Sequence, residues 1–226
     1  MTQLARYLDH AILKPEMTQK EAEDAIRLGI DYKVKTVCVR PCDIDLAVRM
    51  CAGTETEVCA VLSFPHGHDC PEAKAAAAKV YCEKGAKEID MVANYGLIRS
   101  AAWDAVQADI EAVVKVAHAV NVLVKVIFET SQLTPEEIAK TTEICVAAGA
   151  DFVKTSTGFN GRGASEEDVE IMMKTAAGRI KMKPSGGIRD AQRAKMFVDR
   201  GVDRLGVGYN STAAICDGEG NTGEGY

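Results

Sequence analysis

The stretch Glu83-Lys84-Gly85-Ala86-Lys87-Glu88-Ile89-Asp90 contains the end of a predicted helix, a tight turn and the start of a predicted strand. Gly85 suits the turn, because glycine adopts the left-handed conformation that commonly follows a helix. The same succession recurs in Ala147-Ala148-Gly149-Ala150-Asp151-Phe152 and in Asp199-Arg200-Gly201-Val202-Asp203-Arg204, and Gly29 is expected to end an earlier helix in the same way. A unit repeated like this predicts strands that alternate with helices.

Eight short apolar runs are predicted to be strands, at 8–13, 36–39, 58–64, 88–92, 122–127, 151–154, 180–183 and 204–207. The predicted helices between them include 18–28, 70–84, 105–119 and 134–147. Alternating units in this number and length match an α/β fold, the single-domain (β/α)8 TIM barrel. A doubly wound open sheet usually has a glycine-rich turn after its first strand, whereas here Lys14-Pro15-Glu16 follows. We expect residues 1–216 to form the barrel and 217–226 a flexible glycine-rich tail.

Composition excludes several classes of partner. The net charge of −6 argues against a nucleic-acid surface. No apolar run approaches the roughly 18 residues that a membrane-spanning helix needs. The N-terminal residues lack the apolar core of a signal peptide, and the eight cysteines form no dense framework. Reduced thiols and a cytoplasmic location are therefore expected.

Ionisable or reactive residues recur at or near the predicted strand ends, where barrel enzymes carry their chemistry. The residues at this rim are Asp9, His10, Cys38, Arg40, Phe64, Asp90, Lys125, Glu129, Lys154 and Lys183. Any one of them is also compatible with a salt bridge inside the barrel. Their recurrence on successive strands favours a single active site.

Lys154 stands out because an ammonium at the end of an apolar strand is costly to bury. A lysine whose pKa is lowered by burial and by neighbouring positive charge can form a Schiff base with a carbonyl compound. Lys183 ends the next strand in the same way, and Asp90 offers a carboxylate for proton transfer. The iminium itself serves as the electron sink, so no metal or cofactor is expected.

Glycines follow strands seven and eight, where barrels often bind phosphate. Gly186 and Gly187 let backbone N–H groups approach an anion, and Asn210 and Ser211 precede a short predicted helix. Gly158 lies in the corresponding loop after Lys154. The alternative is that these are ordinary strand-to-helix turns.

Together these motifs resemble the 2-deoxyribose-5-phosphate aldolases, class I aldolases with a (β/α)8 fold. The resemblance covers nearly the whole chain, and it is carried by Leu8-Asp9-His10, Thr36-Val37-Cys38-Val39-Arg40-Pro41, Val61-Leu62-Ser63-Phe64-Pro65-His66-Gly67, Glu88-Ile89-Asp90-Met91-Val92-Ala93-Asn94, Lys125-Val126-Ile127-Phe128-Glu129-Thr130, Asp151-Phe152-Val153-Lys154-Thr155-Ser156-Thr157-Gly158-Phe159 and Lys183-Pro184-Ser185-Gly186-Gly187-Ile188-Arg189. The last two motifs are the specific ones. Two departures from the family pattern are Ala11 in place of threonine and a longer, bulkier segment after strand eight, at 206–211.

The resemblance implies the reversible cleavage of 2-deoxy-D-ribose 5-phosphate to acetaldehyde and D-glyceraldehyde 3-phosphate. Lys154 would be the Schiff-base lysine, with Lys183 and Asp90 in proton transfer and Lys125 as a charged neighbour. Small-molecule aldehydes and sugar phosphates are the expected partners, and a homodimer is implied. Two alternatives are a Schiff-base aldolase for substrates without phosphate, and a zinc-dependent or non-catalytic barrel.

Each of the remaining candidate residues has a structural interpretation as well as a functional one. His66-Gly67-His68-Asp69-Cys70 resembles a zinc-binding loop but lacks a complete ligand set. Cys38 is either a reactive thiol at the rim or a buried core residue, and Thr155 is expected to support the site. Tyr226, at the end of the tail, is expected either to enter the site and relay a proton or to belong to a loose terminus.

Overall fold

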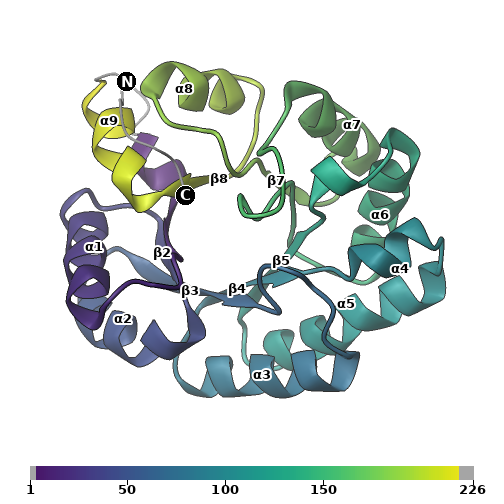
Figure 1. Cartoon of the computed structure of the whole chain (residues 1–226), viewed down its shortest axis with the longest axis horizontal. Helices are drawn as coiled ribbons and strands as arrows, with labels where there is room; N and C mark the ends of the chain where they lie inside the picture. The colour runs from purple at the N-terminus through teal and green to yellow at the C-terminus, as the bar shows by residue number, and fades with distance from the viewer. Residues whose placement is uncertain (1–3, 219–226) are drawn as a thin grey trace.

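A closed ring of parallel strands surrounded by helices forms the protein, and the computed structural model describes residues 4–218 (Figure 1). The strands are β1 (Leu8–Ile12), β2 (Thr36–Val39), β3 (Glu57–Leu62), β4 (Glu88–Val92), β5 (Leu123–Ile127), β6 (Phe152–Lys154), β7 (Lys181–Lys183) and β8 (Leu205–Gly208). Their order is β7-β6-β5-β4-β3-β2-β1-β8. A bridge between Ser185 and Gly206 links the remaining edges, and the Gly206 N–H donates to Pro184 O at 2.8 Å. The predicted (β/α)8 barrel is confirmed.

Helices follow the strands around the outside of the ring. They are α1 (Gln19–Asp31), α2 (Ile44–Cys51), α3 (Pro71–Glu83), α4 (Tyr95–Arg99), α5 (Trp103–His118), α6 (Pro135–Ala147), α7 (Glu166–Ala176), α8 (Ala191–Asp199) and α9 (Thr212–Asp217). Short 3₁₀ turns occur at η1 (Leu4–Tyr7), η2 (Pro41–Asp43), η3 (Thr130–Gln132) and η4 (Tyr209–Ser211). Thr18 and Thr134 each begin a helix with a capping box, which satisfies backbone N–H groups that the helix leaves free.

The glycine turns are mostly as predicted, with one exception. Gly85, Gly149 and Gly201 follow helices with φ of 99°, 77° and 88°. Gly29 does not end its helix, because α1 continues to Asp31. A Cβ at Gly29 would lie 2.8 Å from Val37 Cγ1 and 3.1 Å from the His10 ring, so glycine is needed there for close packing of the helix on the sheet.

Side chains alternate between the two faces of each strand, which divides the interior into two regions. In β4, Ile89 and Met91 belong to the apolar layer between the barrel and its helices. Glu88 and Asp90 bind partners from other strands inside the ring. This alternation carries ionisable residues into the barrel while the outer face of the sheet remains apolar. Within residues 4–218, no helix is long and apolar enough to cross a membrane.

His10 was expected at the active-site rim, but it lies on the other face of β1. Its Nε2 lies 2.9 Å from Ala25 O, and its Nδ1 lies 2.8 Å from Thr212 Oγ1. The carbonyl must accept from Nε2–H, so Nδ1 accepts from the hydroxyl. His10 therefore links β1 to α1 and α9 and takes no part in the site.

Acidification should destabilise the fold through His10. Burial lowers the pKa of His10 from 6.5 to about 4, so the unfolded chain binds its proton first as the pH falls. The stabilising contribution of neutral His10 is intact above pH 6.5. About 3 kcal/mol of the free energy of unfolding is lost as the pH approaches 4. Urea unfolding between pH 7 and 4 measures this slope. His10→Asn should flatten it, and an unchanged slope in that variant would assign the effect to other groups.

Candidate active site

Three lysines meet at one buried carboxylate inside the barrel. Lys154 and Lys183 lie 2.7 Å and 2.6 Å from the same oxygen of Asp90, Oδ2. Lys125 lies 2.9 Å from Oδ1. Strand register explains the meeting, because Lys125 is the Cα partner of Asp90 and Lys183 is that of Lys154. The residues predicted for Schiff-base and proton-transfer chemistry thus lie in direct contact.

A second set of charges supports this cluster from neighbouring strands. Arg204 donates to Asp9 at 2.6 Å and to Glu88 at 2.9 Å. Asp9 also forms an ion pair with Lys183, and Glu88 forms one with Lys125. Buried charges need such partners, because an unpaired ion in a protein interior is very costly. The roles of Glu88 and Arg204 were missed in the sequence, where each reads as an ordinary residue at the start of a strand.

The carboxylates decide the ionisation of the cluster. Burial alone would lower the pKa of Lys125 and of Lys183, but nearby Asp9 and Asp90 outweigh it and raise both pKa values. Burial alone would raise the pKa of Asp90, yet the three lysines hold it well below its usual range. Anions therefore lie between the cations, and Lys125 and Lys183 stay protonated as ammonium groups.

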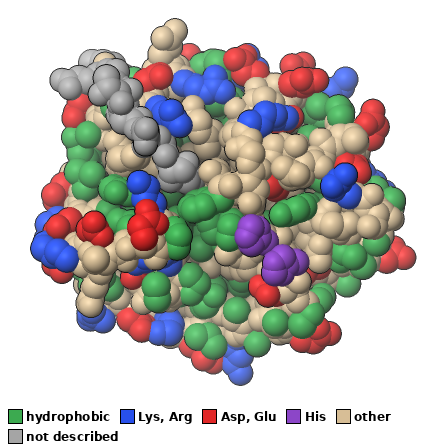
Figure 2. Space-filling view, in the orientation of Figure 1, with side chains coloured by type: hydrophobic (Ala, Val, Ile, Leu, Met, Phe, Trp, Pro, Cys, Tyr) green, Lys and Arg blue, Asp and Glu red, His purple; other side chains and the backbone are tan. Residues whose placement is uncertain are grey.

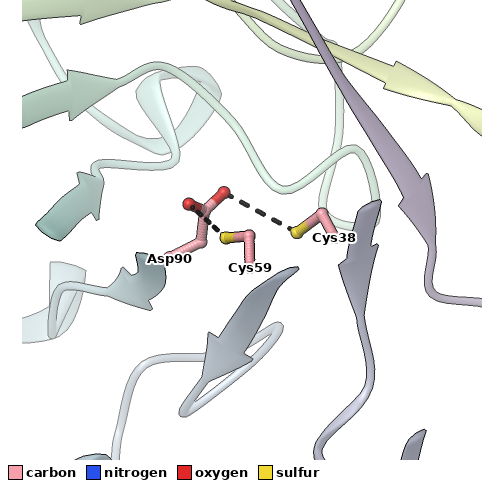
Figure 3. A group of neighbouring side chains, drawn as sticks. All are labelled: Cys38, Cys59 and Asp90. Atoms are coloured by element: carbon pink, nitrogen blue, oxygen red, sulfur yellow. Dashed lines mark hydrogen bonds between the residues drawn. The ribbon is translucent and has the colours of Figure 1, made fainter. Parts of the chain in front are cut away.

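A cluster of mostly apolar side chains adjoins Asp90. Ala11, Leu13, Cys38, Cys59 and Val61 pack into one cluster, and Phe64 and Phe159 lie against it. The two phenylalanine rings meet edge to face, with centroids 5.2 Å apart. Cys59 Sγ lies 3.2 Å from Asp90 Oδ1, and Cys38 Sγ lies 4.0 Å from Oδ2 (Figure 3). Cys38 is thus buried beside Asp90.

The loop after Lys154 is held by a buried glutamate. Glu129 has φ of 58°, a left-handed conformation that costs energy for a residue other than glycine. Its carboxylate accepts from the Thr157 N–H at 3.2 Å and from Asn160 Nδ2 at 3.2 Å. Thr155 Oγ1 accepts from the Ser185 N–H at 3.0 Å and so joins the loops after β6 and β7.

A small pocket lies at the ends of β7 and β8. Its lining is Gly186, Gly187, Ile188, Arg189, Gly206, Val207, Gly208 and Ser211. Three of the five predicted phosphate residues are therefore brought together. Gly158 packs behind Gly186 and does not line the pocket, and neither does Asn210. Arg189, in the motif that follows Lys183, is exposed, and no carboxylate within residues 4–218 pairs with it.

The segment after β8 is more compact than its long, bulky sequence suggests. It forms the single 3₁₀ turn η4 and runs directly into α9. The Tyr209 ring lies edge-on to His10 at 6.4 Å, on the outer side of β1. The Tyr209 ring, which does not line the pocket at the ends of β7 and β8, therefore points away from it.

Comparison with known proteins identifies the family. Residues 4–215 match the model of the DeoC/LacD family aldolases. This chain belongs to that aldolase family. It is 41% identical over 217 residues to a deoxyribose-phosphate aldolase of Clostridium perfringens, with 96% of both chains covered. It is 42% identical over 224 residues to one of Enterococcus faecalis, covering 99% of this chain and 100% of the relative.

Solved structures agree with this assignment to the aldolase family. A structure titled "QR15, an Aldolase" superposes with a TM-score of 0.90 at 37% identity, covering 96% of each chain. The deoxyribose phosphate aldolase of Aeropyrum pernix, which is described as a tetramer, gives a TM-score of 0.87 at 28% identity, covering 95% of this chain and 89% of that one.

Two other surface features of this aldolase-family chain lie apart from the lysines. Figure 2 shows apolar side chains and a pair of histidines near the centre of one face. The rings of His66 and His68 stack with centroids 5.7 Å apart, and within residues 4–218 their loop does not gather three possible metal ligands. A groove of about 680 Å³ lies between α3 and α5 and contains none of the predicted site residues. Tyr226 and most of the predicted tail lie outside the described residues.

Proposed function

We propose that this protein cleaves 2-deoxy-D-ribose 5-phosphate reversibly into acetaldehyde and D-glyceraldehyde 3-phosphate through a Schiff base on Lys154. The observation that carries the proposal is the shared contact of Lys154 and Lys183 with Asp90 Oδ2, inside a member of the aldolase family. The named relatives supply the substrate class.

Lys154 performs the covalent step. Its neutral amine attacks C1 of the open-chain sugar, and loss of water leaves an iminium. The iminium places a positive charge where the ammonium was, so the ion pair with Asp90 is restored once water has left. That charge draws the electrons of the breaking C2–C3 bond, which gives an enamine and releases the three-carbon aldehyde. Protonation at C2 and hydrolysis then release acetaldehyde.

Asp90 and Lys183 manage the protons. The ammonium of Lys154 is 2.7 Å from Asp90, close enough to pass its proton directly before it attacks. The C3 hydroxyl proton leaves toward the same carboxylate–ammonium pair, directly or through water. Lys125 and Asp9 hold that pair in place through their own contacts with it.

An activity assay tests the proposal. Purified protein should release D-glyceraldehyde 3-phosphate from 2-deoxyribose 5-phosphate, read by a coupled dehydrogenase, and should act far more slowly on free 2-deoxyribose. Inorganic phosphate should compete with the phosphorylated sugar. Equal rates on both sugars, without competition by phosphate, would instead support the aldolase for substrates without phosphate.

Arg189 is expected to bind the phosphate together with the N–H groups of Gly186 and Gly187. Arg189→Met should raise KM for 2-deoxyribose 5-phosphate about tenfold or more, since a charge-assisted contact is worth about 1.5–3 kcal/mol. The rate on free 2-deoxyribose should not change. Arg27→Met, which removes an exposed charge from α1, is the matched control. Equal losses on both sugars would show that Arg189 supports the fold rather than the phosphate.

The homodimer and the cytoplasmic location remain predictions. A structurally similar aldolase is described as a tetramer, so a homotetramer is the alternative to the expected homodimer. Light scattering of the purified protein measures it directly.

A further inference from the structure

Cys38 and Cys59 are two thiols on neighbouring strands of the barrel. They are Cα partners in the parallel pairing of β2 with β3, so both side chains point to the same, inner face. Neighbouring strands lie about 4.7–4.9 Å apart, within the roughly 4.4–6.8 Å between Cα atoms that disulfides bridge. Both sulfur atoms and a carboxylate oxygen of Asp90 lie within 4.8 Å of one another (Figure 3).

The surroundings of this pair favour oxidation over metal binding. Lys125 Nζ lies 3.4 Å from Cys59 Sγ, and Lys154 and Lys183 contact the same Asp90. Three ammonium groups repel a divalent cation, and the one that contacts a sulfur, Lys125, favours a thiolate, whereas the Asp90 carboxylate opposes it. Burial raises the pKa of Cys59 well above its ordinary value, which keeps it as a thiol. Cys38 is the first target, because its sulfur lies 4.0 Å from the Asp90 carboxylate, against 3.2 Å for Cys59.

We propose that Cys38 and Cys59 form an oxidisable dithiol that peroxide closes into a disulfide, and that closure lowers the activity of the site. The Cys38 thiolate attacks one oxygen of hydrogen peroxide; the O–O bond breaks, leaving a sulfenic acid and hydroxide. The sulfur of Cys59 then displaces the sulfenic oxygen, which leaves as water with the thiol proton. Two thiols and one peroxide thus give one disulfide and two waters.

Closure acts on Asp90. A disulfide brings the sulfurs to about 2.05 Å and removes both S–H groups. Cys59 then no longer donates to Asp90 Oδ1, a contact of 3.2 Å, and the apolar wall around the pair must shift. Formation of the bond is independent of the proposed function, whereas the loss of activity rests on it.

The test uses the full chain with the exposed thiols removed, as Cys42→Ser/Cys70→Ser. Trypsin then leaves Cys38 as the single cysteine of peptide 36–49, and Cys51 and Cys59 in peptide 50–74. After treatment with hydrogen peroxide, the non-reduced digest should contain these peptides joined and lighter by two hydrogen atoms. Cys59→Ala should abolish the joined species. Cys51→Ala, a buried thiol in the same peptide, should retain it.

Activity is read on the same samples. Closure should lower turnover about tenfold or more, in keeping with a disturbed acid–base group, and dithiothreitol should restore it. Absence of the joined peptides overturns the dithiol. Joined peptides with undiminished turnover overturn the switch. If the unoxidised protein cleaves no sugar, the proposed function fails, and the peptide map still decides whether the bond forms.

Discussion

Lys154→Arg should lose about 10⁴-fold or more of its aldolase turnover while remaining folded, because a guanidinium stays protonated and cannot form an imine. The structure makes this substitution informative. Lys154 is paired with Asp90 at 2.7 Å, and arginine keeps a positive charge opposite that carboxylate. The balance of charges in the barrel is therefore retained, and the loss reports on the chemistry.

Borohydride reduction provides the direct measurement. With acetaldehyde present, the wild-type protein should gain an ethyl group on Lys154, and trypsin should then fail to cleave there. The label should appear in a peptide spanning 141–162, which ends at the next arginine. Label on Lys125 or Lys183, or no label, would contradict the assignment. Lys154→Arg should remain unlabelled under the same conditions.

Asp90→Asn should lower turnover about 10²-fold or more, the usual scale for a positioned acid or base. It should also lower stability by about 3–5 kcal/mol, because three buried ammonium groups lose a shared partner. Lys183→Met should lower turnover similarly, since it removes the other proton-transfer group. Steady-state kinetics well below the unfolding temperature separate the chemical effect from the structural one.

Asp109→Asn is the matched control for Asp90→Asn. Asp109 is also buried and paired with a lysine, Lys74 at 2.7 Å, but that pair lies between α3 and α5, outside the barrel. Its replacement should cost stability and leave turnover nearly unchanged. Comparable losses of turnover in both variants would mean that Asp90 contributes through the fold alone.

Most of the barrel follows from local pattern. Each strand is a short apolar run, and turns such as Gly85 mark where a helix ends, because these signals depend on near neighbours in the chain. The strand-end lysines were predictable for the same reason, since period-two alternation carries Lys154 and Lys183 into the interior. The packing role of Gly29 was not predictable from the sequence, because the side chains that leave no room for a Cβ there, Val37 and His10, lie on neighbouring strands.

The sequence by itself determined the alternation of strands and helices, the ionisable residues at the strand ends and the glycine-rich loops. Only the tertiary structure decided how those residues pair. It placed Asp90 between Lys154 and Lys183, added Glu88 and Arg204 to the cluster, and excluded His10 from it. Buried charges interact over a few ångströms between strands far apart in the chain, so their ionisation depends on the closed barrel and its register.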